Sequence, residues 1–229
     1  MLDGMILHST CCMRHDWHEH PQMVDSSLGG FGIMEGQIPQ NLVTQVGCYD
    51  ERWRFKRIYK NEHSARERAL HLLDPFSDPE AVKPLSLPLL CWEAVRDFPE
   101  VPPHMLQPGF WHEVLAGQWH FKEAIHILEA RVVLLAVRRL ARNVGLRGFR
   151  HLILCDNMSV VLAISKGRAS DFGLLQICRK IAAYSVACDF KVKVRWVVSE
   201  RNLADEPSRR FMTSELLEHE AQLSKLKLA

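Results

Sequence analysis

The chain has 229 residues, 47% of them hydrophobic, which is enough to bury a sizeable core in one large domain or in one domain with an insertion. The formal net charge of +2 is too small to indicate nucleic-acid binding by itself. Seven cysteines without paired spacing argue against a disulfide framework, and no stretch approaches the ~20 apolar residues of a membrane span. Because the first residues also lack the basic and apolar regions of a signal peptide, we expect a protein of the cytoplasm or nucleus with no membrane partner.

Five potential soft metal ligands lie near the start of the chain: Cys11, Cys12, His15, His18 and His20. Their spacing fits no standard paired-ligand pattern, and adjacent cysteines rarely bind one ion together. We therefore interpret residues 1–20 as a leader outside the main fold rather than as a zinc site.

Residues 22–35 have the pattern of a β-hairpin. Apolar residues lead into Asp25, a glycine-rich turn follows, and apolar residues then resume at a spacing of two. The glycines, among them Gly29 and Gly30, let other backbone approach closely. Taken alone, Asp25 would be an ordinary turn residue, so a functional role depends on which groups lie near it.

The pattern becomes irregular between residues 37 and 118. Eight of the eleven prolines fall between positions 75 and 108, which excludes long regular elements there. A short helix at about 62–73 and strands near 45–55 and 111–119 fit the remaining pattern. We therefore predict that residues 37–118 form an insertion packed on the main sheet, with tryptophans covering apolar surface.

The strongest helical pattern covers residues 125–140, where apolar side chains recur at helical spacing. Glu129 lies within the apolar stripe, and a carboxylate on an inward face needs a cation or a metal, because an unpaired buried charge is costly. Glu123, His126 and Glu129 share one helix face, as in the half-site of a di-iron bundle. That architecture needs four long helices and a second such motif, whereas this sequence predicts strands, so we set it aside.

Leu152 to Cys155 form an apolar run that is too short for a helix, and Asp156, Asn157 and a helical pattern follow at once. This pattern predicts a buried parallel strand that places Asp156 at its carboxyl end, where open α/β sheets hold their chemistry. Alternatively, Asp156 simply caps the following helix by accepting its first amide protons. A second helix is predicted over residues 171–187.

Residues 190–196 alternate between apolar and basic side chains, which predicts a half-exposed strand with a solvated basic face. In the next segment, Asn202 and Asp205 lie three residues apart at the expected start of a helical turn, with Pro207 at an early position. Residues 211–229 read as a C-terminal amphipathic helix.

Four acids thus occupy comparable positions along the chain: Asp25, Glu129, Asp156 and Asp205. Packing several carboxylates together is unfavourable, because like charges raise one another's pKa. Two divalent cations would offset this repulsion. Mg²⁺ prefers carboxylates, waters and phosphate oxygens, and two such ions roughly 4 Å apart can clamp an in-line displacement at phosphorus.

The order of these motifs resembles the ribonuclease H family, in particular the ribonuclease H domains of reverse-transcribing elements, including tyrosine-recombinase (DIRS-like) retrotransposons. The matching segments are 24–32, 127–133, 154–157 and 195–209. Each segment is weak alone, but the ordered set is specific. The resemblance covers residues of about 21–36 and 119–210.

This resemblance implies a mixed five-stranded sheet flanked by helices, in a ribonuclease H-like domain over residues 21–210 that the proline-rich insertion interrupts. It implies an endonuclease that hydrolyses the RNA strand of RNA·DNA hybrids with two Mg²⁺ ions, for which Mn²⁺ can substitute. The implied catalytic metal ligands are Asp25, Glu129, Asp156 and Asp205, and the implied substrate contacts are Gly29, Gly30, Asn157, Asn202 and Arg209. A reverse transcriptase domain from the same retroelement polyprotein is the implied protein partner.

The sequence departs from the family pattern in three places, one of which is the long proline-rich insertion, for which the family offers no counterpart. No histidine lies between Trp196 and Asp205, where many members have one. The basic extra helix of some cellular members is missing, so hybrid binding would depend on another domain. One alternative is a catalytically inactive or domesticated ribonuclease H-like module that binds nucleic acid or a polymerase partner. Another is a DNA transposase or integrase on the same fold, against which the spacing of Asn202 and Asp205 argues.

Overall fold

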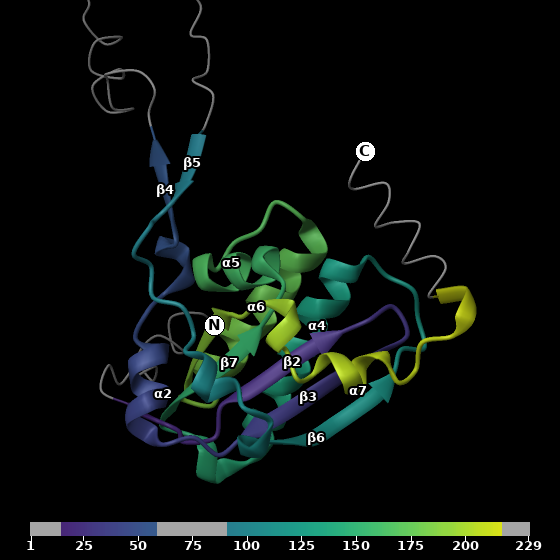
Figure 1. Ribbon diagram of the computed structural model, residues 1–229, viewed down its shortest axis with the longest axis horizontal. Coiled ribbons are helices and arrows are strands. Elements are labelled where there is room, and N and C mark those ends of the chain that lie inside the picture. The colour runs from purple at the N-terminus through teal and green to yellow at the C-terminus, as the bar shows by residue number, and fades with distance from the viewer. Residues whose placement is uncertain (1–14, 59–90, 217–229) are drawn as a thin grey trace, which may run out of the picture. The chain divides into compact units, whose positions relative to one another are not determined.

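The computed structural model describes residues 15–58 and 91–216 (Figure 1). The chain divides into two compact units, one formed by the residues up to Arg52 and from Pro99 onward, and a smaller one formed by residues 53–98. Parts of the chain discussed above lie outside the described residues: the helix predicted at about 62–73, Cys11 and Cys12 of the predicted leader, and most of the C-terminal helix predicted at 211–229.

The larger unit is built on one mixed sheet. Its strands within the described residues are β1 (Asp16–Trp17), β2 (Gln22–Ser26), β3 (Gly30–Gly36), β6 (Trp111–Gln118), β7 (Phe149–Cys155) and β8 (Lys191–Trp196). β7 pairs in parallel with β1, β2 and β8, whereas β2, β3 and β6 form an antiparallel meander. Helices flank this sheet (Figure 1), so the predicted mixed α/β architecture is confirmed.

β7 is the buried parallel strand that the apolar run predicted. Its residues Leu152 to Cys155 are all buried, as expected for a strand that is covered on both faces. The strand ends directly before Asp156, and α5 (Met158–Lys166) begins after Asn157. The side-chain oxygen of Asn157 accepts from the backbone N–H of Val160 at 3.2 Å and so caps the helix.

Three helices cover one face of the sheet: α4 (Ile125–Arg142), α5 and α6 (Phe172–Ala187). The apolar stripe of α4 is buried in a cluster that also contains Val24 of β2 and Ile153 of β7. The helices predicted over 125–140 and 171–187 are therefore confirmed. None of the helices in the described part of the chain combines the length and the apolar character needed to cross a bilayer.

A second buried cluster lies on the opposite face and contains Trp17, Met23 and Leu154. The elements on or near this face are α2 (Gln40–Gly47), α7 (Asp205–Arg209) and the 3₁₀ turns η3 (Pro103–Leu106), η4 (Pro108–Phe110) and η6 (Ser199–Arg201). Alternate residues of β2 and β7 consequently face two separate cores. Val24 and Cys155 lie in the α4 cluster, whereas Met23 and Leu154 lie in the α2 cluster.

The predicted insertion at 37–118 is too long. Residues 111–118 form β6, which pairs with β3 in the main sheet, and Val43 and Val46 of α2 belong to the core. The strand predicted near 45–55 is wrong, because this stretch contains the end of α2, a 3₁₀ turn at Glu51–Trp53 and only the first residue of the next strand. The unit that separates from the main sheet is the shorter stretch 53–98.

The main fold also begins earlier than the predicted boundary at residue 21. Asp16 and Trp17 form β1 and pair with Phe149 and Arg150 of β7, so the predicted leader contributes to the sheet. A two-residue strand is too short to produce a periodic pattern, which explains the error. Two of the potential ligands set aside above, His18 and His20, contact each other with ring centroids 5.1 Å apart.

β8 corrects the expectation of a fully solvated basic face, because its Arg195 is 0% exposed. The Nε atom of Arg195 donates to Oε1 of Glu51 at 2.8 Å, and Glu51 is equally buried. The terminal guanidinium nitrogens donate to the carbonyl oxygens of Val46, at 2.6 Å, and of Pro99. One buried side chain thus binds two segments that are far apart in the sequence.

The smaller unit contains the antiparallel strands β4 (Phe55–Ile58) and β5 (Cys91–Ala94). Beyond the strand pair, the backbone N–H of Val95 donates to the carbonyl oxygen of Arg54 at 2.9 Å. The guanidinium of Arg54 lies 4.7 Å from the ring centroid of Phe98, at the other end of this unit in sequence.

We predict that Glu51→Gln lowers the free energy of unfolding by about 3 kcal/mol or more, because the amide leaves the buried charge of Arg195 uncompensated. Asp50→Asn is the matched control. Asp50 pairs with Lys193 at 2.7 Å where both side chains are partly exposed, so its loss should cost at most about 1 kcal/mol. Urea unfolding measures both changes, and equal losses would contradict this assignment.

Candidate metal centre

Asp25 lies in the middle of the sheet on β2 and is 4% exposed. Its Oδ1 accepts from Nδ2 of Asn202 at 3.1 Å, and its Oδ2 accepts from the hydroxyl of Ser208. Burial raises the pKa of Asp25 to about 7, and the negative charge of Asp156 adds to this, whereas the Ser208 hydrogen bond opposes it. Asp25 is therefore a buried acid whose charge is only partly compensated.

Glu129 lies on the second turn of α4 and is 6% exposed. Within the described residues, its Oε2 has no hydrogen-bond partner. Burial raises the pKa of Glu129 well above its usual value, and the charges of Asp25, Asp156 and Asp205 raise it further. A hydrogen bond from the backbone of Ser26 acts in the opposite direction. The predicted inward-facing carboxylate is confirmed, and no described cation compensates its buried oxygen.

Asp156 follows the last residue of β7, as predicted. Its Oδ2 accepts from the hydroxyl of Ser199, while its buried Oδ1 has no partner among the described residues. The indole N–H of Trp196 donates to the backbone carbonyl of Asp156 at 2.8 Å. Asn157, rather than Asp156, caps α5, so the helix-cap alternative for Asp156 is not what the structure shows.

Asp205 is the first residue of α7, and its side chain is 43% exposed. Its Oδ1 accepts from Nε of Arg209 at 2.6 Å, one turn further along α7. The helix packs on the hairpin through close contacts: the Ser27 hydroxyl donates to the Ser208 carbonyl at 2.7 Å, and a Cβ at Gly32 would lie 2.7 Å from the Ala204 carbonyl oxygen. These contacts fix the position of Asp205.

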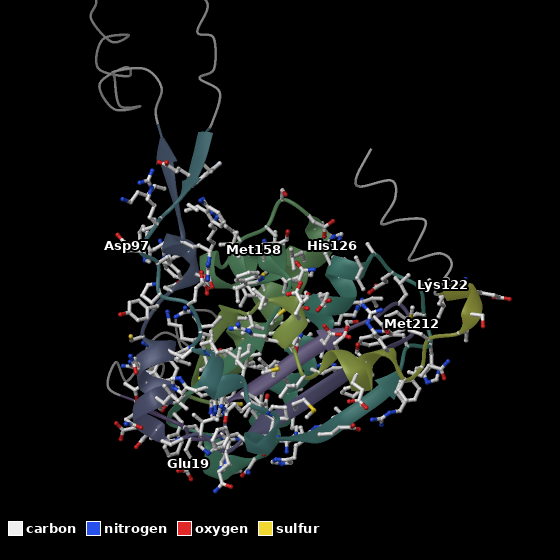
Figure 2. All side chains as sticks on the ribbon, viewed as in Figure 1. Glu19, Asp97, Lys122, His126, Met158 and Met212 are labelled. Atoms are coloured by element: carbon white, nitrogen blue, oxygen red, sulfur yellow. The ribbon has the colours of Figure 1, made fainter. Side chains whose placement is uncertain are left out.

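The structure brings the four predicted acids to one region, because Asp25 and Glu129 each interact electrostatically with Asp156 and Asp205. In Figure 2, His126 near the start of α4 and Met158 at the start of α5 lie along the same edge of the sheet, the edge at which β7 ends. The acids thus come from four separate elements that meet at this edge.

The tightest group of potential ligand atoms differs from the prediction. Glu129, Asp156 and Cys155 each place one such atom within 4.8 Å of the other two. Sequence reasoning missed Cys155, although it directly precedes Asp156. The reason is that Cys155 projects into the α4 core beside Glu129, whereas Asp156 lies beyond the strand, where the alternation of side chains ends. The hydroxyls of Ser199 and Ser208 were also missed.

The predicted substrate contacts have structural roles in this fold. A Cβ at Gly29 would lie 2.5 Å from the Phe211 carbonyl oxygen, and one at Gly30 would lie 2.7 Å from the Gly117 carbonyl oxygen. These two glycines therefore allow close packing of neighbouring backbone, as predicted. Asn157 caps α5, Asn202 binds Asp25, and Arg209 binds Asp205. That any of these residues contacts a substrate stays a prediction.

The di-iron half-site does not form around Glu129. Glu123 makes a two-point ion pair with Arg131, with one N–O distance of 2.6 Å. The ring of His126 lies 4.0 Å from the carboxylate of Asp171. Within the described residues, the ionic partners of Glu123 and His126 are therefore Arg131 and Asp171, and neither partner is one of the four acids.

The donor set fits a hard divalent cation such as Mg²⁺ or Mn²⁺. Two buried carboxylate oxygens, Oε2 of Glu129 and Oδ1 of Asp156, have no partner within the described residues, and a cation would satisfy both. It would also offset the repulsion that raises the pKa of Asp25 and Glu129. Burial, followed by the charge of Glu129, raises the pKa of the Cys155 thiol, so the sulfur stays protonated and is a poor ligand for these ions.

Comparison of the chain with protein-family models, with curated proteins and with solved structures finds no significant match. The function must therefore be inferred from the residues of this centre and from the fold that positions them.

We predict that Asp25→Asn stabilises the protein in EDTA at pH 8 by up to about 4 kcal/mol. The pKa of Asp25 is about 7 in the folded chain, compared with 3.8 for an unperturbed aspartate, the value expected in the unfolded chain. Between these two pH values the folded state keeps a proton on Asp25 that the unfolded state has released. Stability contributed by this proton is present below pH 3.8 and is lost as the pH rises through about 7. Asparagine cannot titrate, and it can still accept from Asn202 and donate to the Ser208 oxygen.

Thermal unfolding of both proteins between pH 4 and pH 8, in EDTA, measures this effect. The stability difference should be small at pH 4 and should grow toward pH 8. Asp25→Ala is the matched control, because it removes the charge but also removes both hydrogen bonds. If the difference in stability between the two proteins were constant over the whole pH range, the raised pKa of Asp25 would be contradicted.

Proposed function

We propose that this chain is a ribonuclease H-like, metal-dependent endonuclease that hydrolyses the RNA strand of RNA·DNA hybrids with two Mg²⁺ ions. The observation that carries the proposal is the buried carboxylate of Glu129, which has an unpartnered oxygen and lies in the field of three further acids. A fold that needed only stability would replace such a group with an apolar one. A cation bound between these acids would compensate the buried carboxylate of Glu129.

The topology supports the same proposal. The first acid lies on β2 of an antiparallel hairpin, the second on α4, the third directly after the parallel strand β7, and the fourth at the start of α7, the helix that follows β8 in sequence. This order of acids on a mixed sheet flanked by helices is compatible with the ribonuclease H resemblance. The fold alone does not determine the activity, so the acids carry the functional argument.

In this proposal Asp25, Glu129, Asp156 and Asp205 hold the cations. When bound, two such cations supply an activated water and stabilise the leaving oxygen of an in-line displacement at phosphorus. The chain itself orients the ligands: Asn202 and Ser208 fix both oxygens of Asp25, and Ser199 fixes one oxygen of Asp156. These hydrogen bonds leave Oδ1 of Asp156 and Oε2 of Glu129 available.

A cavity of about 590 Å³ lies beside this centre and supports a nucleic-acid substrate. Asn157 lines it next to Asp156, and Lys166 and Arg168 line it at the far end of α5. Lysine and arginine side chains commonly bind the phosphate groups of nucleic acids. Ser159 and Ser170 add polar groups to the lining of the cavity. Lys166 at the end of α5 and Arg168 in the link to α6 thus supply positive charge to a lining that also contains the acid Asp171.

We predict that the chain cuts a labelled RNA·DNA hybrid in Mg²⁺ or Mn²⁺, and that Asp156→Asn and Glu129→Gln each reduce the rate at least about 100-fold. Both substitutions preserve side-chain size, so the loss would follow from the changed ligand. Asp50→Asn is the control, because Asp50 is paired with Lys193 and is not one of the proposed ligands, so the rate should be unchanged.

Gel analysis of the products beside double-stranded RNA and double-stranded DNA establishes the substrate. Cutting of both strands of DNA would favour a transposase-like enzyme instead. Tight hybrid binding without any cutting would support the alternative of an inactive module that depends on a polymerase partner. Unchanged cutting by Asp156→Asn would contradict the assigned ligands.

A further inference from the structure

Cys155 lies among the acids of this centre and adds a sulfur atom to their carboxylate oxygens as a potential metal ligand. Cys155 is fully buried, and its ligand atom lies within 4.8 Å of one oxygen on each of Glu129 and Asp156. Within the described residues, no other set of three histidine, cysteine or acidic side chains comes this close together. The other described cysteines therefore lack such an arrangement.

Two observations support a cation site formed by these three side chains. Oε2 of Glu129, in a side chain that is 6% exposed, has no described hydrogen-bond partner, and neither has Oδ1 of Asp156. In addition, the backbone N–H of Asn157 interacts with the sulfur of Cys155, which would stabilise a thiolate once a cation had replaced its proton. Two carboxylate oxygens and one sulfur with a backbone donor make a mixed oxygen and sulfur ligand set.

We propose that Glu129, Cys155 and Asp156 form a binding site for a thiophilic divalent cation of the Zn²⁺ class. Zn²⁺ accepts cysteine sulfur and carboxylate oxygen in one tetrahedral shell, whereas Mg²⁺ avoids sulfur. Three protein ligands leave the fourth position to water, which can enter beside the partly exposed Asp156. Binding forms a bond between the cation and sulfur, and the thiol proton leaves to solvent.

Occupation of this site excludes the hard cations, because Glu129 and Asp156 cannot serve both sets of ions at once. Zn²⁺ is thus an inhibitor of the centre, a consequence that rests on the proposed nuclease function. The binding itself does not rest on that function, since it requires only the geometry of three side chains. The two ideas can therefore fail separately.

Titration of the full chain with Cd²⁺ tests the binding, because a cadmium–thiolate bond has its own ultraviolet charge-transfer absorption. Cys155→Ser should bind one Cd²⁺ fewer per chain than the unsubstituted protein and lose the corresponding absorption. Cys178→Ser is the matched control, since Cys178 is a buried free cysteine on α6 outside this group. Glu129→Gln, which keeps the sulfur, should weaken the same binding at least about 10-fold.

Circular dichroism and thermal unfolding show whether each variant is folded, and Glu129→Gln provides a second test if Cys155→Ser is not. An unchanged titration in Cys155→Ser overturns the proposal. In cleavage assays, inhibition by Zn²⁺, measured relative to each protein's own rate in Mg²⁺, should weaken at least about 10-fold in Cys155→Ser. Cadmium binding at Cys155 in a chain that cuts no hybrid would support the site and reject the nuclease, whereas cutting without that binding would do the reverse.

Discussion

The main physical constraint on this structure is that like charges are buried together near the carboxyl ends of β2 and β7. Glu129 and Asp25 are almost completely buried, and each is destabilised by the acids around it. The chain offsets part of this cost with hydrogen bonds from Asn202 and Ser208, which reach Asp25 from the segment that also carries Asp205. The helix α7 therefore both supplies one acid, Asp205, and stabilises another through the hydroxyl of Ser208. The oxygens that still lack a described partner, Oε2 of Glu129 and Oδ1 of Asp156, are the ones that a cation would bind.

The sheet explains why the acids meet although no two share an element. Parallel pairing of β7 with β2 puts their carboxyl ends at the same edge, and α4 crosses behind that edge on one face (Figure 1). Asn202 and Ser208 reach Asp25 from the segment after β8, next to the second core. The centre is thus assembled from both faces of the sheet. This arrangement also explains the position of Cys155. Its side chain points to the face of the sheet that α4 covers, so its sulfur lies close to the carboxylate of Glu129.

Much of this could be predicted from the sequence where local patterns decide the structure. The apolar run before Asp156 and the stripe around Glu129 predicted a strand and a helix that are both present. Arg195 could not be placed, because an alternating strand does not reveal which face is covered, and its partner Glu51 is 144 residues away. β6 was assigned to the insertion because nearby prolines dominated the pattern, whereas its pairing with β3 is a long-range property. Such contacts are decided by packing, which single-sequence periodicity does not contain.

The buried guanidinium of Arg195 has a consequence for how this chain can change during evolution. It binds Glu51 and the carbonyl oxygen of Pro99, which are the residues on either side of the stretch from Arg52 to Phe98. The two ends of that stretch are therefore held within reach of one side chain, whatever the stretch contains. Because the entropy of closing a loop grows only slowly with its length, the stretch can be lengthened, shortened or exchanged at little cost to the sheet. The position between Glu51 and Pro99 is therefore suited to the insertion of a domain.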